Sequence, residues 1–156
     1  MRDFVIEKAK ACAFSGHRIL ENGFSTKQLE FTINYLLNNG YNQFLVGMAL
    51  GFDTICFHYL EKIKTSQDIK IIACIPCKSQ AQMFSLKQKF EYERMLSVAD
   101  MTVFVSQEYS NTCMQKRNRF MVDNASCLVA HIIRDKSGTA NTIRYAEKQG
   151  VKVYYV

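Results

Sequence analysis

The sequence lacks the features of a membrane or exported protein. No segment reaches the roughly 18 consecutive apolar residues that suggest a membrane-spanning helix. The N-terminus, MRDFVIEKAK, carries charges where an export signal has an apolar stretch, so we expect a cytoplasmic protein. The 156 residues contain one proline, no low-complexity tract and no internal repeat. We therefore predict a single domain over residues 1–156, long enough to bury a core.

Several motifs of cofactor chemistry are also absent. The sequence contains neither the dinucleotide fingerprint GxGxxG nor the phosphate-binding loop GxxxxGK[ST]. Cys74 and Cys77 form a CxxC at the end of an apolar run, but no second pair follows at a spacing that would complete a zinc site. We expect the six cysteines to be reduced core residues, and we expect no metal and no cofactor.

Acidic residues are the minority among the charged ones. The 20 basic and 14 acidic residues give a net charge of +6. This excess suits an anionic partner such as a nucleotide or nucleic acid, but it is also common among proteins that bind neither.

What is present is an alternation of strand-like and helix-like segments. Short apolar runs typical of buried strands occupy residues 10–15, 43–47, 69–75, 101–106, 127–133 and 152–156. Apolar residues at helical spacing occupy residues 25–39, 52–64, 78–100, 114–124 and 139–149. We expect the third helix to be irregular near its start, with Phe90, Met95 and Leu96 facing inward. The alternation predicts a three-layer α/β/α, Rossmann-like domain with a mostly parallel sheet.

Ligands of open parallel sheets bind beyond the carboxyl ends of the strands, so the strand-to-helix junctions are the candidate sites. The first junction, SGHR, combines Gly16 with Arg18, whose guanidinium can grip a phosphate. His17 has no cysteine or serine nucleophile beside it, so we expect it to position groups rather than catalyse. His58 on an exposed helix face, His131 within a strand and Glu93 on a charged helix are weaker candidates for a general base.

The second junction lies in FLVGMALGFD, where Gly47, Ala49 and Gly51 precede Asp53. Glycines would let the main chain approach a ligand, and amides at the start of the next helix would point outward to an anion. A tight turn explains the same residues equally well. Asp53 either accepts hydrogen bonds from ribose hydroxyls or complements the helix dipole.

Two further segments carry polar residues at expected helix starts. In DKSGT, residues 135–139, Ser137 or Thr139 can cap the following helix. In MQKRNRFMVD, residues 114–123, a basic cluster of Lys116, Arg117 and Arg119 occupies the wrong end of a helix for dipole compensation. These side chains are either solvated or bind an external anion, and the second interpretation is favoured.

The sequence resembles the YpsA-like branch of the SLOG superfamily in five segments that occur in the expected order. They are the SGHR turn, the GMALGFD turn, IPC after the third strand, RNRFMVD and SGT. That superfamily also contains DprA/Smf and the LOG-type phosphoribohydrolases. The resemblance runs from about Ala11 to the C-terminus, and it implies a Rossmann-like domain that binds a nucleotide or nucleotide-derived molecule. The binding residues that it implies are Gly16, His17, Arg18, Gly47, Ala49, Gly51, Asp53, Arg117, Asn118, Asp123, Gly138 and Thr139.

The resemblance leaves three functions open. LOG-type enzymes carry a PGGxGTxxE segment, but residues 137–143 read SGTANTI, with no proline, no paired glycine and no following acid. The sequence therefore favours a sensor or sequestering protein that binds its ligand without catalysis. A phosphoribohydrolase-like N-glycosidase using Glu93 or Asp53 remains an alternative. Binding of single-stranded DNA is a second alternative, because a DprA-like GxAxGxD turn is present. We also expect a homo-oligomer, since domains of this kind often pair through surface helices.

Overall fold

The computed structural model describes residues 4–21, 24–133 and 136–156 and contains one six-stranded sheet. The strands are β1 (Ala11–Ser15), β2 (Gln43–Val46), β3 (Lys70–Ile75), β4 (Met101–Phe104), β5 (Cys127–Ala130) and β6 (Lys152–Tyr155). The α-helices are α1 (Thr26–Asn38), α2 (Phe52–Lys64), α3 (Leu86–Val98), α4 (Cys113–Asp123) and α5 (Gly138–Lys148). Within the described ranges, no helix is both long enough and apolar enough to cross a membrane.

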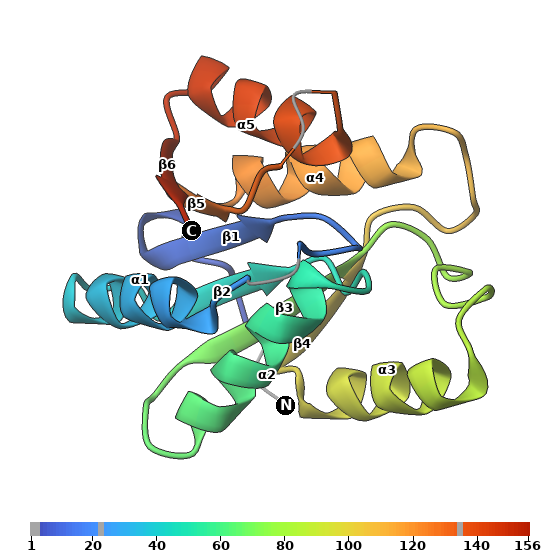
Figure 1. Cartoon of the computed structure of the whole chain (residues 1–156), viewed down its shortest axis with the longest axis horizontal. Helices are drawn as coiled ribbons and strands as arrows, with labels where there is room; N and C mark the ends of the chain where they lie inside the picture. The colour runs from blue at the N-terminus through green and yellow to red at the C-terminus, as the bar shows by residue number, and fades with distance from the viewer. Residues whose placement is uncertain (1–3, 22–23, 134–135) are drawn as a thin grey trace.

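All strands pair in parallel, in the order β4-β3-β2-β1-β5-β6. The chain winds outward from β1 to β4 and then returns to the other side of β1. Because parallel crossovers are right-handed, this reversal moves the later helices to the opposite face. In Figure 1, α4 and α5 lie above the sheet and α1 to α3 below it. The predicted three-layer fold is confirmed, and the strand order reverses between β1 and β5.

The core has two halves, one on each side of the sheet. Cys12 and Phe14 of β1 point toward the side of α1 and α2, whereas Ala11 and Ala13 point toward α4 and α5. This alternation follows from the two-residue period of a strand. All six cysteines are buried and free, which confirms the prediction that they are core residues.

The third helix is shorter than predicted. It begins at Leu86, where the Ser85 side chain accepts a hydrogen bond from the Gln88 amide in a capping box, and residues 78–85 form turns instead. The inward orientation predicted for Phe90 is wrong, since 74% of this residue is exposed. Tyr92 and Met95 fix the buried face, and Phe90 lies roughly 160° from Tyr92 around the helix axis.

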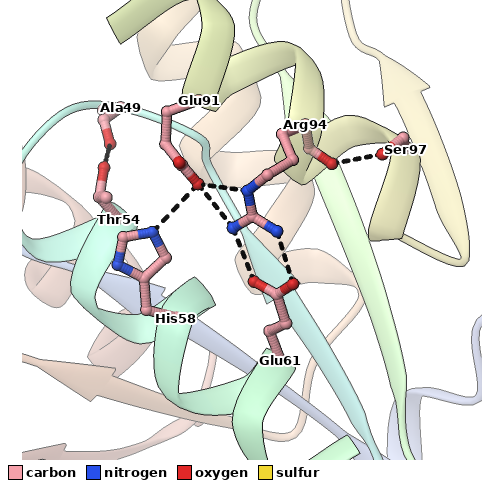
Figure 2. Close-up of polar contacts among 7 residues, drawn as sticks. All are labelled: Ala49, Thr54, His58, Glu61, Glu91, Arg94 and Ser97. Carbon is pink, nitrogen blue, oxygen red and sulfur yellow. Dashed lines mark hydrogen bonds and ion pairs between the residues drawn. The ribbon is translucent and has the colours of Figure 1, made fainter. Parts of the chain in front are cut away.

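Ionic contacts link α3 to α2. Figure 2 shows the guanidinium of Arg94 on both carboxylate oxygens of Glu61, at 2.6 and 2.8 Å, and on Glu91 of its own helix. His58 contacts the same Glu91 carboxylate at 3.3 Å. The Arg94 hydrogen bonds lower the pKa values of Glu61 and Glu91. Because only Tyr92 and Met95 of α3 are buried, these contacts help to position the helix and the 78–85 segment that precedes it.

The turn between β2 and α2 packs tightly against the turn after β1. We predict that Gly51→Ala disrupts this packing and destabilises the protein. Gly51 has φ 82°, and an added Cβ would overlap the Arg18 carbonyl. Gly150 is the matched control, because it has φ 75° but no atom within 4 Å of an added Cβ. Gly51→Ala should lower the free energy of unfolding by about 1–3 kcal/mol more than Gly150→Ala. Urea unfolding measures both losses, and equal losses would contradict the packing.

Candidate functional site

A cavity of about 780 Å³ opens at the point where the strand order reverses, beyond the carboxyl ends of β1 and β5. Its walls come from the segment after β1, the turn after β2, the first half of α4 and the start of α5. The structure brings most of the predicted site residues to this cavity. Those that line it are Gly16, His17, Arg18, Gly47, Ala49, Asp53, Arg117, Asn118, Gly138 and Thr139.

The first junction is held by its own neighbours and leaves Arg18 at the surface. A Cβ at Gly16 would overlap the Phe52 ring, so the glycine is needed for internal packing. His17 is buried, and its Nε2 accepts a hydrogen bond from the Ile133 amide at 2.8 Å. This bond ties the turn after β1 to the segment after β5. Arg18 is exposed, and its Nη2 lies 3.5 Å from the Met114 sulfur.

At the second junction, one of the helix-start amides that were predicted to point outward has an acceptor within the chain. The Ala49 amide donates to Asp53 Oδ2 at 3.1 Å, and the Phe52 amide donates to the His17 carbonyl at 3.0 Å. The Ala49 carbonyl accepts a hydrogen bond from the Thr54 hydroxyl at 3.2 Å (Figure 2). The prediction of outward amides at the start of α2 is therefore wrong for Phe52, whose amide has a backbone acceptor, and the turn amide of Ala49 is also occupied, by the Asp53 side chain.

Gly47 is required by a buried pair of opposite charges. A Cβ there would lie 2.7 Å from Arg117 Nη1 and 2.9 Å from Asp53 Oδ2. Arg117 is 5% exposed, and its Nη1 donates to the carbonyls of Gly47 and Cys74, the latter at 3.4 Å. Its Nε donates to Asn118 Oδ1 at 2.8 Å. The guanidinium thus connects α4 to the ends of β2 and β3.

Burial and opposite charge act against each other on both members of this pair. Burial raises the pKa of Asp53 to about 6, although the Arg117 charge, the Ala49 amide and Arg18 pull the pKa down. Burial also lowers the pKa of Arg117, and the Asp53 charge opposes this shift. A carboxyl group with a pKa of about 6 is mostly ionised at pH 7 and becomes protonated when the pH falls slightly below neutral.

The basic cluster at the start of α4 is divided by the fold. Arg117 is 5% exposed, so the solvated interpretation is wrong for this residue, and its Nε and Nη1 already donate within the chain. It still lines the cavity, so its contact with an external anion stays a prediction. Arg119 lies over the Tyr145 ring, 5.1 Å from its centroid, in a cation–π contact. Lys116 is exposed.

The third junction forms the start of α5. Ser137 is the cap, because its side chain accepts a hydrogen bond from the Ala140 amide at 3.1 Å. Gly138 and Thr139 follow in the first turn, where helix amides have no acceptor within the helix. Lys136 is exposed at the same wall of the cavity. Asp135, the first residue of the predicted segment, lies outside the described residues.

Two predicted site residues lie elsewhere. Gly51 packs against the backbone of residues 17–18, and Asp123 ends α4 with its carboxylate accepting a hydrogen bond from the Tyr145 hydroxyl at 2.7 Å. Conversely, sequence reasoning missed Met114 and Lys136 as lining residues. For Lys136, its position between the fifth strand and the SGT segment was an available signal. For Met114, the sequence offers none that we recognise.

The other titratable candidates lie away from the cavity. His58 and Glu93 are exposed on α2 and α3, in agreement with the prediction for both. His131 follows β5 rather than lying within it, and its Nδ1 is 2.6 Å from the Val156 carbonyl. Across the described parts of the chain, no three His, Cys, Asp or Glu side chains gather as metal ligands do.

We predict a pH signature for the burial of Asp53. Since its pKa is raised in the folded protein, the folded state binds more protons than the unfolded state between about pH 4 and pH 6. The contribution of Asp53 to stability must therefore fall as the pH rises through this window. The free energy of unfolding of the parent minus that of Asp53→Asn should drop by about 2–3 kcal/mol between pH 4 and pH 7.

Chemical denaturation at several pH values measures this difference. Asp68→Asn, at an exposed acid before β3, is the control and should show no such drop. A difference for Asp53→Asn that stays constant or rises with pH would mean that the carboxylate is not destabilised by burial.

Solved structures of similar fold belong to DNA processing proteins. The DprA structure from Streptococcus pneumoniae superposes with a TM-score of 0.71 at 19% identity, over 95% of this chain and 50% of that one. DprA from Helicobacter pylori, described for its binding of single-stranded DNA, gives a TM-score of 0.67 at 18% identity, over 95% of this chain and 65% of that one. The chain thus spans half to two thirds of these proteins, and the likeness shows the fold.

Sequence comparison adds a relative and a family. The chain is 38% identical, over 121 residues, to the uncharacterized SPbeta prophage-derived protein YoqJ of Bacillus subtilis (strain 168). The alignment covers 68% of this chain and 70% of YoqJ. The model of the YpsA family, described as the YspA SLOG family, matches residues 21–155. This match spans most of the chain and includes each of the ordered motifs except SGHR, which lies at residues 15–18. The chain therefore belongs to the YpsA family of SLOG proteins.

Proposed function

We propose that this protein binds a nucleotide or nucleotide-derived small molecule in the cavity beyond β1 and β5, as a sensor or sequestering protein without catalysis. The observation that carries the proposal is the cavity itself. It lies at the reversal of the strand order, where open parallel sheets bind ligands, and its volume of about 780 Å³ suits a small molecule.

The charges around the cavity match the two polar parts of a nucleotide. Arg18 and Lys136 are exposed at the walls of the cavity. Lys136 directly precedes the N-cap of α5, and a phosphate at that helix N-terminus is favoured by amides and by the helix dipole. No ion pair to Arg18 occurs within the described residues, so its charge is available to an anion. Deeper in the cavity, the ionised Asp53 can accept hydrogen bonds from sugar hydroxyls.

Binding of single-stranded DNA is the second candidate, and the description of Helicobacter pylori DprA favours it. Such binding generally combines a basic groove with aromatic stacking. In this chain, however, Arg117 is buried and Arg119 covers a tyrosine ring, so the cluster on α4 offers less charge than its sequence suggests. A steep loss of affinity for single strands with added salt would support this candidate.

An N-glycosidase is the third candidate. Asp53 is the carboxylate that lines the cavity with a raised pKa, whereas Glu93 lies outside it. Incubation with nucleoside 5′-monophosphates, followed by chromatography to detect free base, distinguishes an N-glycosidase from a protein that only binds its ligand. A pure binder releases no free base, and release that Asp53→Asn abolishes would replace our proposal with an enzymatic one.

We predict that Arg18 carries much of the affinity for a phosphate-bearing ligand. Calorimetric titration with AMP, GMP and ADP-ribose should detect binding, and Arg18→Ala should weaken it about ten-fold, the effect of one lost charge-assisted contact. Lys116→Ala removes the same charge from an exposed position outside the cavity and should change affinity less than two-fold.

Mass spectrometry of small molecules released on denaturing the purified protein extends the search beyond these probes. If Arg18→Ala and Lys116→Ala lower the affinity equally, the ligand is attracted non-specifically by net charge. The absence of binding to all three probes, together with no released molecule, would overturn the proposed function.

A further inference from the structure

A second cavity of about 470 Å³ adjoins the first and has different chemistry. It lies between the segment after β3, the turn after β2 and the start of α4. Its lining includes Pro76, Cys77, Phe84, Tyr109 and Cys113, with no charged side chain among the described residues other than Arg18. A mostly apolar recess with aromatic walls is suited to a flat, uncharged ring.

The wall between the two cavities is thin and adjustable. Arg18, Ala49 and Met114 line both of them. The side chains of Arg18 and Met114 meet there in a 3.5 Å contact between Nη2 and a thioether sulfur, which is a weak acceptor. Met114 is 37% exposed, and its unbranched side chain can change rotamer at little cost. A chain of ligand atoms crossing this wall would pass directly beside the Arg18 guanidinium.

The floor of the second cavity is rigid, in contrast to its wall. Gln80 donates to the Gly47 carbonyl at 2.9 Å and accepts a hydrogen bond from the Tyr92 hydroxyl at 3.0 Å. The Phe84 ring packs edge-on against the Tyr92 ring, with centroids 5.7 Å apart. At the rim, Met83 and Tyr109 are 91% and 69% exposed, so both side chains are accessible to a ligand that enters the cavity.

We propose that the second cavity is a subsite for the base of a two-part ligand, in which two nucleoside halves are joined through phosphates. One half lies in the first cavity, the linking phosphates pass beside Arg18, and the base of the other half stacks against Tyr109. This inference rests on the proposed function and specifies the ligand class. It also explains why polar and apolar recesses adjoin at a single exposed arginine.

The test compares AMP with NAD⁺, which carries a second base beyond the pyrophosphate. NAD⁺ should bind about ten-fold or more tightly than AMP, because it adds one stacked base. Tyr109→Ala should weaken NAD⁺ binding about five-fold or more and change AMP binding less than two-fold. Phe90→Ala is the matched control, since Phe90 is 74% exposed on α3 and lines neither cavity.

Each other outcome overturns the inference in an identifiable way. If Tyr109→Ala weakens the binding of AMP and of NAD⁺ equally, a single mononucleotide spans both cavities. If NAD⁺ binds no better than AMP, or if Phe90→Ala has the same effect as Tyr109→Ala, the second cavity is not a base subsite. In both cases AMP still binds and the proposed function stands. If neither probe binds, both proposals fail for these ligands.

Discussion

The burial of one guanidinium constrains the entire candidate site. Arg117 reaches from α4 to the carbonyl groups at the ends of β2 and β3. A buried charge without partners costs several kcal/mol, so the surrounding groups must supply acceptors and an opposite charge. Asp53 supplies the charge, and Gly47 supplies the space. Three segments far apart in the chain are therefore fixed relative to one another before any ligand is present.

The floor of the cavity is consequently close to neutral, and the excess positive charge lies at the mouth. The charges of Arg117 and Asp53 offset each other at the floor, whereas Arg18 and Lys136 lie at exposed positions, opposed by Glu21. Fields from exposed charges attract an anion but are screened by salt, while buried groups are screened much less. In the proposed complex, the mouth therefore attracts the ligand, and the buried floor selects among sugars by hydrogen-bond geometry.

The sequence predicted the architecture because apolar periodicity reports directly on strands and helices. It was less informative about which groups the small residues accommodate. A glycine indicates close approach, but here the approaching groups are the Phe52 ring at Gly16, and Arg117 with Asp53 at Gly47. Phe52 and Arg117 come from elements distant in sequence from these glycines, so a local pattern cannot identify them as partners. The inward position of Arg117 did have a signal, since Cys113, Arg117 and Met121 are spaced four residues apart on one helix face.

Asp53 also bears on the choice between binding and catalysis. With a pKa of about 6, the carboxyl group is roughly nine-tenths ionised at pH 7, so it acts mainly as an acceptor rather than as a proton donor. Its Oδ2 already accepts a hydrogen bond from the Ala49 amide, which orients the group toward a structural role in the turn. Departure of a base from a sugar is assisted by a donor to the leaving nitrogen. An ionised, oriented carboxylate suits the recognition of hydroxyl groups, and hydrolysis would require a second group to protonate the leaving nitrogen. This requirement for a separate proton donor is the physical reason for placing binding before hydrolysis.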